Sequence, residues 1–113
     1  MRYLRDGGPA KGKVLAKVEG RYIKDGSDDF GHILVNFEGR FIREGAGQSG
    51  EILANLDGNF IREGNNNLGE ILGIIEGNNI IREKEILFNV EGYASAHEKA
   101  ALAVAGLMLK GLI

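Results

Sequence analysis

The segment Gly50–Gly64 has the sequence G-E-I-L-A-N-L-D-G-N-F-I-R-E-G, and the rest of the chain largely repeats it. Two runs of alternating apolar and polar residues, 52–56 and 60–63, flank the pair Asp57-Gly58. An Asp-Gly pair between two such runs is a strong signal for a β-hairpin, because glycine tolerates the positive φ that a tight turn requires. We therefore predict a hairpin with a two-residue type I′ turn at Asp57-Gly58.

Equivalent units recur at a spacing of 19 residues and begin at Gly12, Gly31, Gly50 and Gly69. A fixed period of this length predicts a repeat architecture in which each hairpin packs against the next. In the fourth unit, Asn78-Asn79 places one additional residue after the turn, which predicts a bulge or a three-residue turn there.

The two ends of the repeat region are complementary halves of one unit. Residues 1–11 resemble a second strand without a first, and residues 84–92 resemble a first strand without a second. An unpaired strand edge is a liability for aggregation, so we predict that Val90-Glu91 pairs with the strand at Met1–Asp6. The result is a closed ring of ten short strands.

The C-terminal segment predicts a buried helix. Ser95 and Glu98 have the spacing of a capping box, and residues 100–109 contain no polar side chain. A helix that is apolar all round is buried on every side, whereas a membrane span needs about 20 apolar residues. We therefore place the helix inside the ring. The predicted fold is mainly β with one C-terminal α-helix: a closed five-fold barrel of 19-residue β-hairpins around a buried apolar helix.

We expect one domain, 1–113, with hairpin repeats in residues 1–93 and the helix in residues 94–113. The alternation within each hairpin predicts which residues share a face. The inward, apolar face is expected to carry Ile52, Ala54, Leu56 and Ile61, and the opposite, half-buried face Leu53, Asn55, Phe60 and Arg62.

The units of form G-x-I-L-x-N-V-E-G and Y-I-R-x-G, followed by an apolar helix, resemble the bacterial five-fold β-flower proteins and the related four-fold ones. The resemblance covers nearly the whole chain. Departures are Lys17 and Ile74, where other units have Asn, and Ile80, where others have Tyr or Phe. The resemblance implies the fold, and it implies no assigned activity, no cofactor and no catalytic residues.

Composition narrows the classes of function. The chain has 113 residues, 43% of them apolar, and a net charge of −2, so it has no basic footprint for nucleic acid. It contains no cysteine, which excludes disulfides and thiolate chemistry and favours a cytoplasmic location. Because Met1–Asp6 already belongs to the repeat, we expect no signal peptide.

Three groups of residues are candidates for chemistry. The first group consists of basic residues that recur from hairpin to hairpin. Under five-fold symmetry they would form a ring that binds an anion, although pairing with acids across strands is the simpler interpretation. This group comprises Arg5, Lys24, Arg43, Arg62 and Arg82. Asp25, Asp28 and Asp29 could bind calcium, but the loop lacks the EF-hand pattern and a turn-forming role is simpler. His32 and His97 have no nucleophile in a recognisable arrangement, so we predict no catalytic site.

These observations predict a non-enzymatic structural or protein-interaction module that meets a protein partner or a second copy of itself. The first alternative is binding of a small ligand, a carbohydrate or an anion, through the loops rich in Gly, Asn and Asp. The weaker alternative is membrane association through the C-terminal helix.

Overall fold

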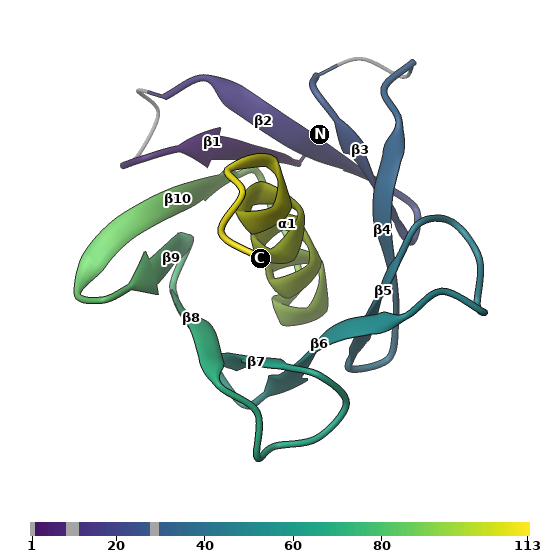
Figure 1. The fold of residues 1–113 in the computed structure, drawn as a ribbon. Coiled ribbons are helices and arrows are strands. Elements are labelled where there is room, and N and C mark those ends of the chain that lie inside the picture. Colours follow the sequence, from purple (N-terminus) through teal and green to yellow (C-terminus); the bar gives the residue numbers. More distant parts are fainter. Residues whose placement is uncertain (1, 9–11, 28–29) are drawn as a thin grey trace.

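The computed structural model describes residues 2–8, 12–27 and 30–113, which form a closed antiparallel barrel around one helix (Figure 1). The strands run around the barrel in the order β1-β10-β9-β8-β7-β6-β5-β4-β3-β2. The elements are β1 (Tyr3–Asp6), β2 (Val14–Glu19), β3 (Tyr22–Asp25), β4 (Ile33–Glu38), β5 (Phe41–Glu44), β6 (Ile52–Asp57), β7 (Phe60–Glu63), β8 (Ile71–Glu76), β9 (Asn79–Arg82), β10 (Glu85–Glu91) and α1 (Ala96–Leu109). The predicted ten-strand ring is confirmed.

The barrel closes where the two half-repeats meet. Leu4 in β1 lies opposite Val90 in β10, and both side chains are buried. Tyr3 lies opposite Glu91 in the same antiparallel register. Strands from opposite ends of the chain thus complete one hairpin unit, as predicted.

The hairpin turns lie one residue later than predicted. Asp57 pairs with Phe60, which leaves Gly58-Asn59 as the two-residue turn. Gly58 has φ of 61°, whereas Asn59 is not among the residues with positive φ. This is the pattern of a type II′ turn, in which glycine takes the first central position. The residue before the glycine therefore ends the first strand and lies outside the turn, so it does not need the turn conformation that favours Asp. This explains why Glu occupies that position in the other hairpins.

The fourth hairpin has no additional residue, so the predicted insertion at Asn78-Asn79 is wrong. Glu76 pairs with Asn79 across Gly77-Asn78, as Asp57 pairs with Phe60. Asn79 therefore occupies the register position that Phe60 has in the third hairpin.

A β-bulge occurs wherever one hairpin joins the next. Ile61 pairs with Gly73 and Arg62 pairs with Ile71, so Leu72 lies between these two pairs and no residue of β7 lies opposite it. An additional residue interrupts the two-residue alternation of side chains. Leu72 is accordingly 4% exposed and Ile71 42% exposed. The same shift leaves one leucine unpaired at each junction: Leu15, Leu34, Leu53, Leu72 and Leu87.

The bulges correct the predicted faces of the first strand in each hairpin. Leu53 packs against the core, as Leu15, Leu34 and Leu87 do, although we expected it on the outer face. Ile52 precedes the bulge and lies opposite Arg43, on the outer side. The faces predicted for Ala54, Leu56 and Ile61 hold, since all three are buried in the core.

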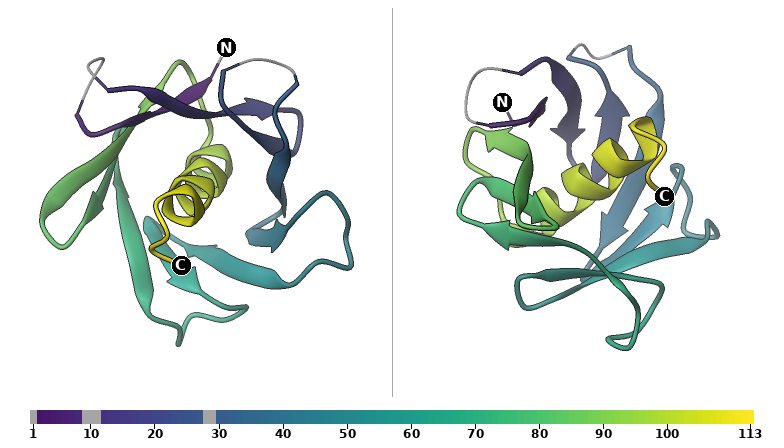
Figure 2. Two further views of the ribbon diagram at one scale, coloured as in Figure 1. Left: turned by 45° about the horizontal axis from the view of Figure 1, so that its top comes forward. Right: turned by 60° about the vertical axis from the view of Figure 1, so that its left-hand side comes forward.

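The helix lies in the lumen in all three views (Figures 1 and 2). Its capping box is present, because the Ser95 side chain accepts from the Glu98 amide and the Glu98 carboxylate accepts from the Ser95 amide. All eight residues from Ala100 to Leu107 are buried. The predicted position of the helix is confirmed.

No helix in residues 2–8, 12–27 and 30–113 combines the length and the apolar character needed to cross a membrane.

Candidate functional site

The two ends of the barrel differ, and the end at which the helix terminates carries a ring of acids. We call this end the mouth. At the ends of β3, β5 and β7 lie Asp25, Glu44 and Glu63. Glu44 pairs with Val35 and Glu63 pairs with Ala54, which are both fully buried in the core. Residues directly opposite each other in an antiparallel pair share a face, so these carboxylates lie on the lumen side of the mouth.

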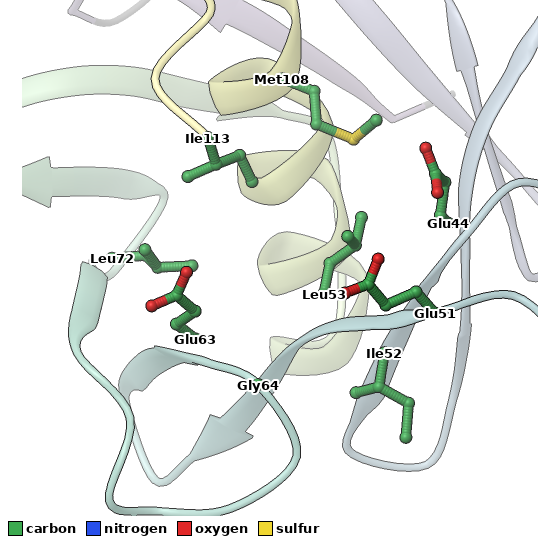
Figure 3. A pocket seen from close by; sticks show the side chains of 9 residues that line it. All are labelled: Glu44, Glu51, Ile52, Leu53, Glu63, Gly64, Leu72, Met108 and Ile113. Atoms are coloured by element: carbon green, nitrogen blue, oxygen red, sulfur yellow. The ribbon is translucent and has the colours of Figure 1, made fainter.

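A pocket of about 370 Å³ opens at the mouth between the helix and strands β5 to β8 (Figure 3). Its apolar side chains are those of Leu53, Leu72, Met108 and Ile113, and its polar part consists of Glu44, Glu51, Glu63 and Gly64. Ile52 also borders the pocket, but its side chain points away from the helix. Of the described residues, those that line the pocket include no Lys, Arg or His. The pocket therefore combines an apolar floor with a purely anionic rim.

The helix adds negative potential to the mouth. The C-terminus of a helix carries roughly half a negative charge, which a basic residue in the last turn usually offsets. In α1, all of it described, the last turn carries no basic residue. Asp6 occupies the corresponding position at the end of β1, opposite the buried Phe88, and therefore belongs to the ring of acids. Lys110 at the C-cap forms an ion pair with Asp6 at 2.7 Å, so its positive charge is balanced by this acid.

The predicted ring of cations lies on the outer face and bonds to its own hairpins. Arg5 pairs with Glu91 and donates to the Gly12 carbonyl. Arg62 pairs with Asp57 at 3.0 Å and also donates to a loop carbonyl. Anion binding by this ring stays a prediction, but these contacts occupy the groups that an anion would need.

The other members of this group have similar roles, except Arg82. Lys24 pairs with Glu19 at 3.0 Å, and Arg43 donates to the Gly50 carbonyl at 3.1 Å. Arg82 is not equivalent to them, because Ile81 occupies the register position of Arg62. Its guanidinium instead donates to the Leu72 carbonyl at 3.1 Å. The expected five-fold set thus has four members.

The predicted calcium loop is described only in part. Asp25 lies at the mouth, whereas Asp28 and Asp29 lie outside the described residues. Within the described ranges, no group of three or more His, Cys, Asp or Glu side chains could hold a metal ion. His32 and His97 are both exposed and lie outside the pocket lining.

Buried asparagines hold the loops of the second and third hairpins against the barrel. The Asn55 amide donates to the carbonyls of Gly64 and Asn66 at 2.8 and 2.9 Å. Asn36 makes the equivalent bonds to Gly45 and Gly47 at 2.7 and 3.2 Å. Each asparagine satisfies two carbonyls of the loop that follows its own hairpin, so its recurrence has a structural cause.

Sequence reasoning did not identify the glutamates of the pocket as a site. A signal was present, because Glu44 and Glu63 each directly follow the outward-facing Arg43 or Arg62. Neighbouring residues in a strand point to opposite faces, so an acid after an outward arginine lies on the lumen side.

Tandem hairpins closed into a barrel around a C-terminal helix are the architecture of a β-flower protein. The model of the family described as "6-fold beta flower protein" matches residues 4–109, so the chain belongs to that family. The β-flower resemblance is thereby confirmed, although the family description gives a six-fold repeat and the described residues form ten strands, or five hairpins. No curated protein and no solved structure matches the chain.

Proposed function

We propose that the protein is a non-enzymatic interaction module that receives a basic, partly apolar segment of a partner protein in its mouth. The pocket carries this proposal, because Leu53, Leu72 and Met108 form an apolar floor beneath a rim of carboxylates. A Lys or Arg side chain matches both parts: its aliphatic stem covers apolar surface, and its charged head bonds to carboxylates.

The electrostatics of the free protein support a cationic partner. Glu44, Glu51 and Glu63 line one pocket near the negative end of the helix dipole, and none has a cation beside it in the pocket lining. Like charges in this arrangement repel one another, and a cation relieves that repulsion. Exposed pairs contribute little individually, so we expect the charges to govern specificity and association rate more than affinity.

The contents of the pocket also support a binding role over catalysis. Among the described residues that line it, glutamate is the only titratable type, and no Ser, Thr or Tyr hydroxyl accompanies it. The described lining thus lacks the hydroxyl or thiol nucleophile and the His or Lys base of the common nucleophile–base arrangements. The anionic rim likewise disfavours an anionic ligand. Membrane association through α1 would require eight buried residues to leave the lumen. A cytoplasmic location stays a prediction.

A pair of model peptides tests the proposal. One alternates Lys with Leu and the other alternates Glu with Leu, and each is titrated into the labelled protein while fluorescence anisotropy is measured. We expect only the basic peptide to bind, and more weakly at high salt. Replacing Glu44 and Glu63 with Gln should weaken its binding by about 2- to 30-fold, at ~0.2–1 kcal/mol per lost ion pair.

The matched control is Glu76→Gln, which removes one negative charge, as Glu44→Gln and Glu63→Gln each do as single substitutions, at the turn after β8 on the opposite end of the barrel. It should leave the affinity unchanged. If Glu76→Gln weakens binding as much as the pocket substitutions do, the peptide senses only net charge. The proposal is then wrong, and it also fails if the basic peptide does not bind.

A further inference from the structure

The outer face of one hairpin departs from the other four. At the centre of each hairpin a cross-strand pair points outward, and in the third it is Asn55 with Arg62. The equivalent pairs elsewhere are Asn36 with Arg43, Lys17 with Lys24, and Asn89 with Arg5. In the hairpin of β8 and β9 the pair is Ile74 with Ile81.

Further apolar side chains extend this pair into a continuous surface. Phe60 pairs with Ile74 on one side, and Ile86 pairs with Ile81 on the other. Phe60, Ile71 and Ile86 are 38%, 42% and 44% exposed. We call this surface, formed by Phe60, Ile71, Ile74, Ile81 and Ile86, the isoleucine wall. It spans β7 to β10, which are adjacent in the barrel (Figure 1).

The wall is uncovered because the connection after β9 is short. Arg82 pairs with Glu85, so only Glu83 and Lys84 connect β9 to β10. Both have positive φ, 53° and 70°, which is costly for residues other than glycine. There is no long loop here for a central asparagine to hold, as Asn55 does in the third hairpin. The loss of that role explains why asparagine is dispensable, but not why both residues of the pair are isoleucine.

We propose that a second copy of this chain docks on the isoleucine wall. In a two-fold dimer the same surface of both copies is in contact, so it must be complementary to itself. In the part of the chain that the structure describes, the central pair of each of the other four hairpins contains a cation. In a two-fold contact that cation would face the same cation of the second copy and repel it. The Ile74–Ile81 pair brings no charge to the centre of the contact, and contiguous exposed apolar surface marks interaction sites.

The double substitution Ile74→Asn/Ile81→Arg tests the wall, because it installs the pair that the third hairpin already has. Sedimentation velocity over a wide concentration range should show the wild-type chain in a reversible equilibrium between monomer and dimer. The variant should raise the dimer dissociation constant at least about tenfold, since each copy contributes both substitutions to the contact. A single substitution of an exposed side chain, Ile71→Thr, should weaken the dimer without risk to the fold.

The matched control removes an exposed apolar side chain elsewhere. Phe30, in the loop between β3 and β4, is 94% exposed, and Phe30→Ser should leave the dimer unchanged. A wild-type chain that stays monomeric at every concentration would overturn the proposal and leave the wall to a different protein. A dimer that persists in both wall variants, or dissociates in Phe30→Ser, would overturn it too. Glu44→Gln/Glu63→Gln should not affect the dimer, so the wall and the mouth can fail separately.

Discussion

Replacing Gly106 with alanine should destabilise the protein, although alanine is the better helix former. Gly106 lies in α1 where the helix meets the seam of the barrel. A Cβ atom there would lie 2.6 Å from Leu4 Cδ2 and 2.7 Å from Phe88 Cζ. Alanine gains about 1 kcal/mol in helix propensity over glycine, and overpacking costs about 1–3 kcal/mol. We expect a net loss of about 1 kcal/mol in the free energy of unfolding, or about 4 °C in Tm.

A second substitution identifies the cause of this loss. Phe88→Leu removes the ring that the new methyl group would meet, at a cost of its own of about 1–2 kcal/mol. In that background the contact with the ring is gone, and the flexible Leu4 side chain can shift into the space that the ring leaves, so Gly106→Ala should be neutral or stabilising. The double-mutant cycle should therefore show a coupling energy of about 1–2 kcal/mol.

The assay is urea unfolding of all four chains, followed by circular dichroism and checked by thermal melts. Unchanged m-values would show that the substitutions act on stability and not on the extent of unfolding. The reasoning fails if Gly106→Ala stabilises the wild-type background, or if the effects of the two substitutions simply add.

Three further predictions concern the loops and the mouth. In the loop between β5 and β6, Gly50→Ala would place a Cβ atom 2.1 Å from the Glu44 carbonyl oxygen, whereas a Cβ atom at Gly47 would have its nearest neighbour 3.7 Å away. Chemical denaturation should show that Gly50→Ala lowers the free energy of unfolding by about 3 kcal/mol or more, whereas Gly47→Ala should change it little. Asn55→Ala removes the donor to the carbonyls of Gly64 and Asn66 and should cost about 1–3 kcal/mol, with faster amide exchange confined to the loop between β7 and β8; exchange in that loop that stays as slow as in the wild type would contradict this role. Glu44→Gln/Glu63→Gln relieves repulsion at the mouth and should raise Tm slightly, by the equivalent of about 0.5 kcal/mol; a lower Tm would show that these carboxylates stabilise the free protein.

Local patterns along the chain were sufficient to predict the barrel and its contents. The alternation within each unit and the polar-free run of residues 100–109 depend on neighbours in sequence, and comparing the units with one another gives the 19-residue spacing and the complementary half-repeats. The capping box of Ser95 and Glu98 is local in the same sense. Hydrophobic periodicity and cap residues act within a few positions, so they can be recognised before any strand is paired.

The pocket and the isoleucine wall depend on register, which is a property of strand pairs. Leu53 faces the core because a bulge shifts which residues lie opposite one another. The 19-residue spacing by itself places Ile81, and not Arg82, at the position of Arg62, but the insertion wrongly predicted at Asn78-Asn79 obscured this. A shift of one residue moves a side chain to the other face, and hydrogen bonding between strands selects that shift. A one-residue bulge leaves almost no trace in the hydrophobic pattern of a single strand. The faces of the first strand in each hairpin and the lining of the pocket could therefore be assigned only once the strands were paired.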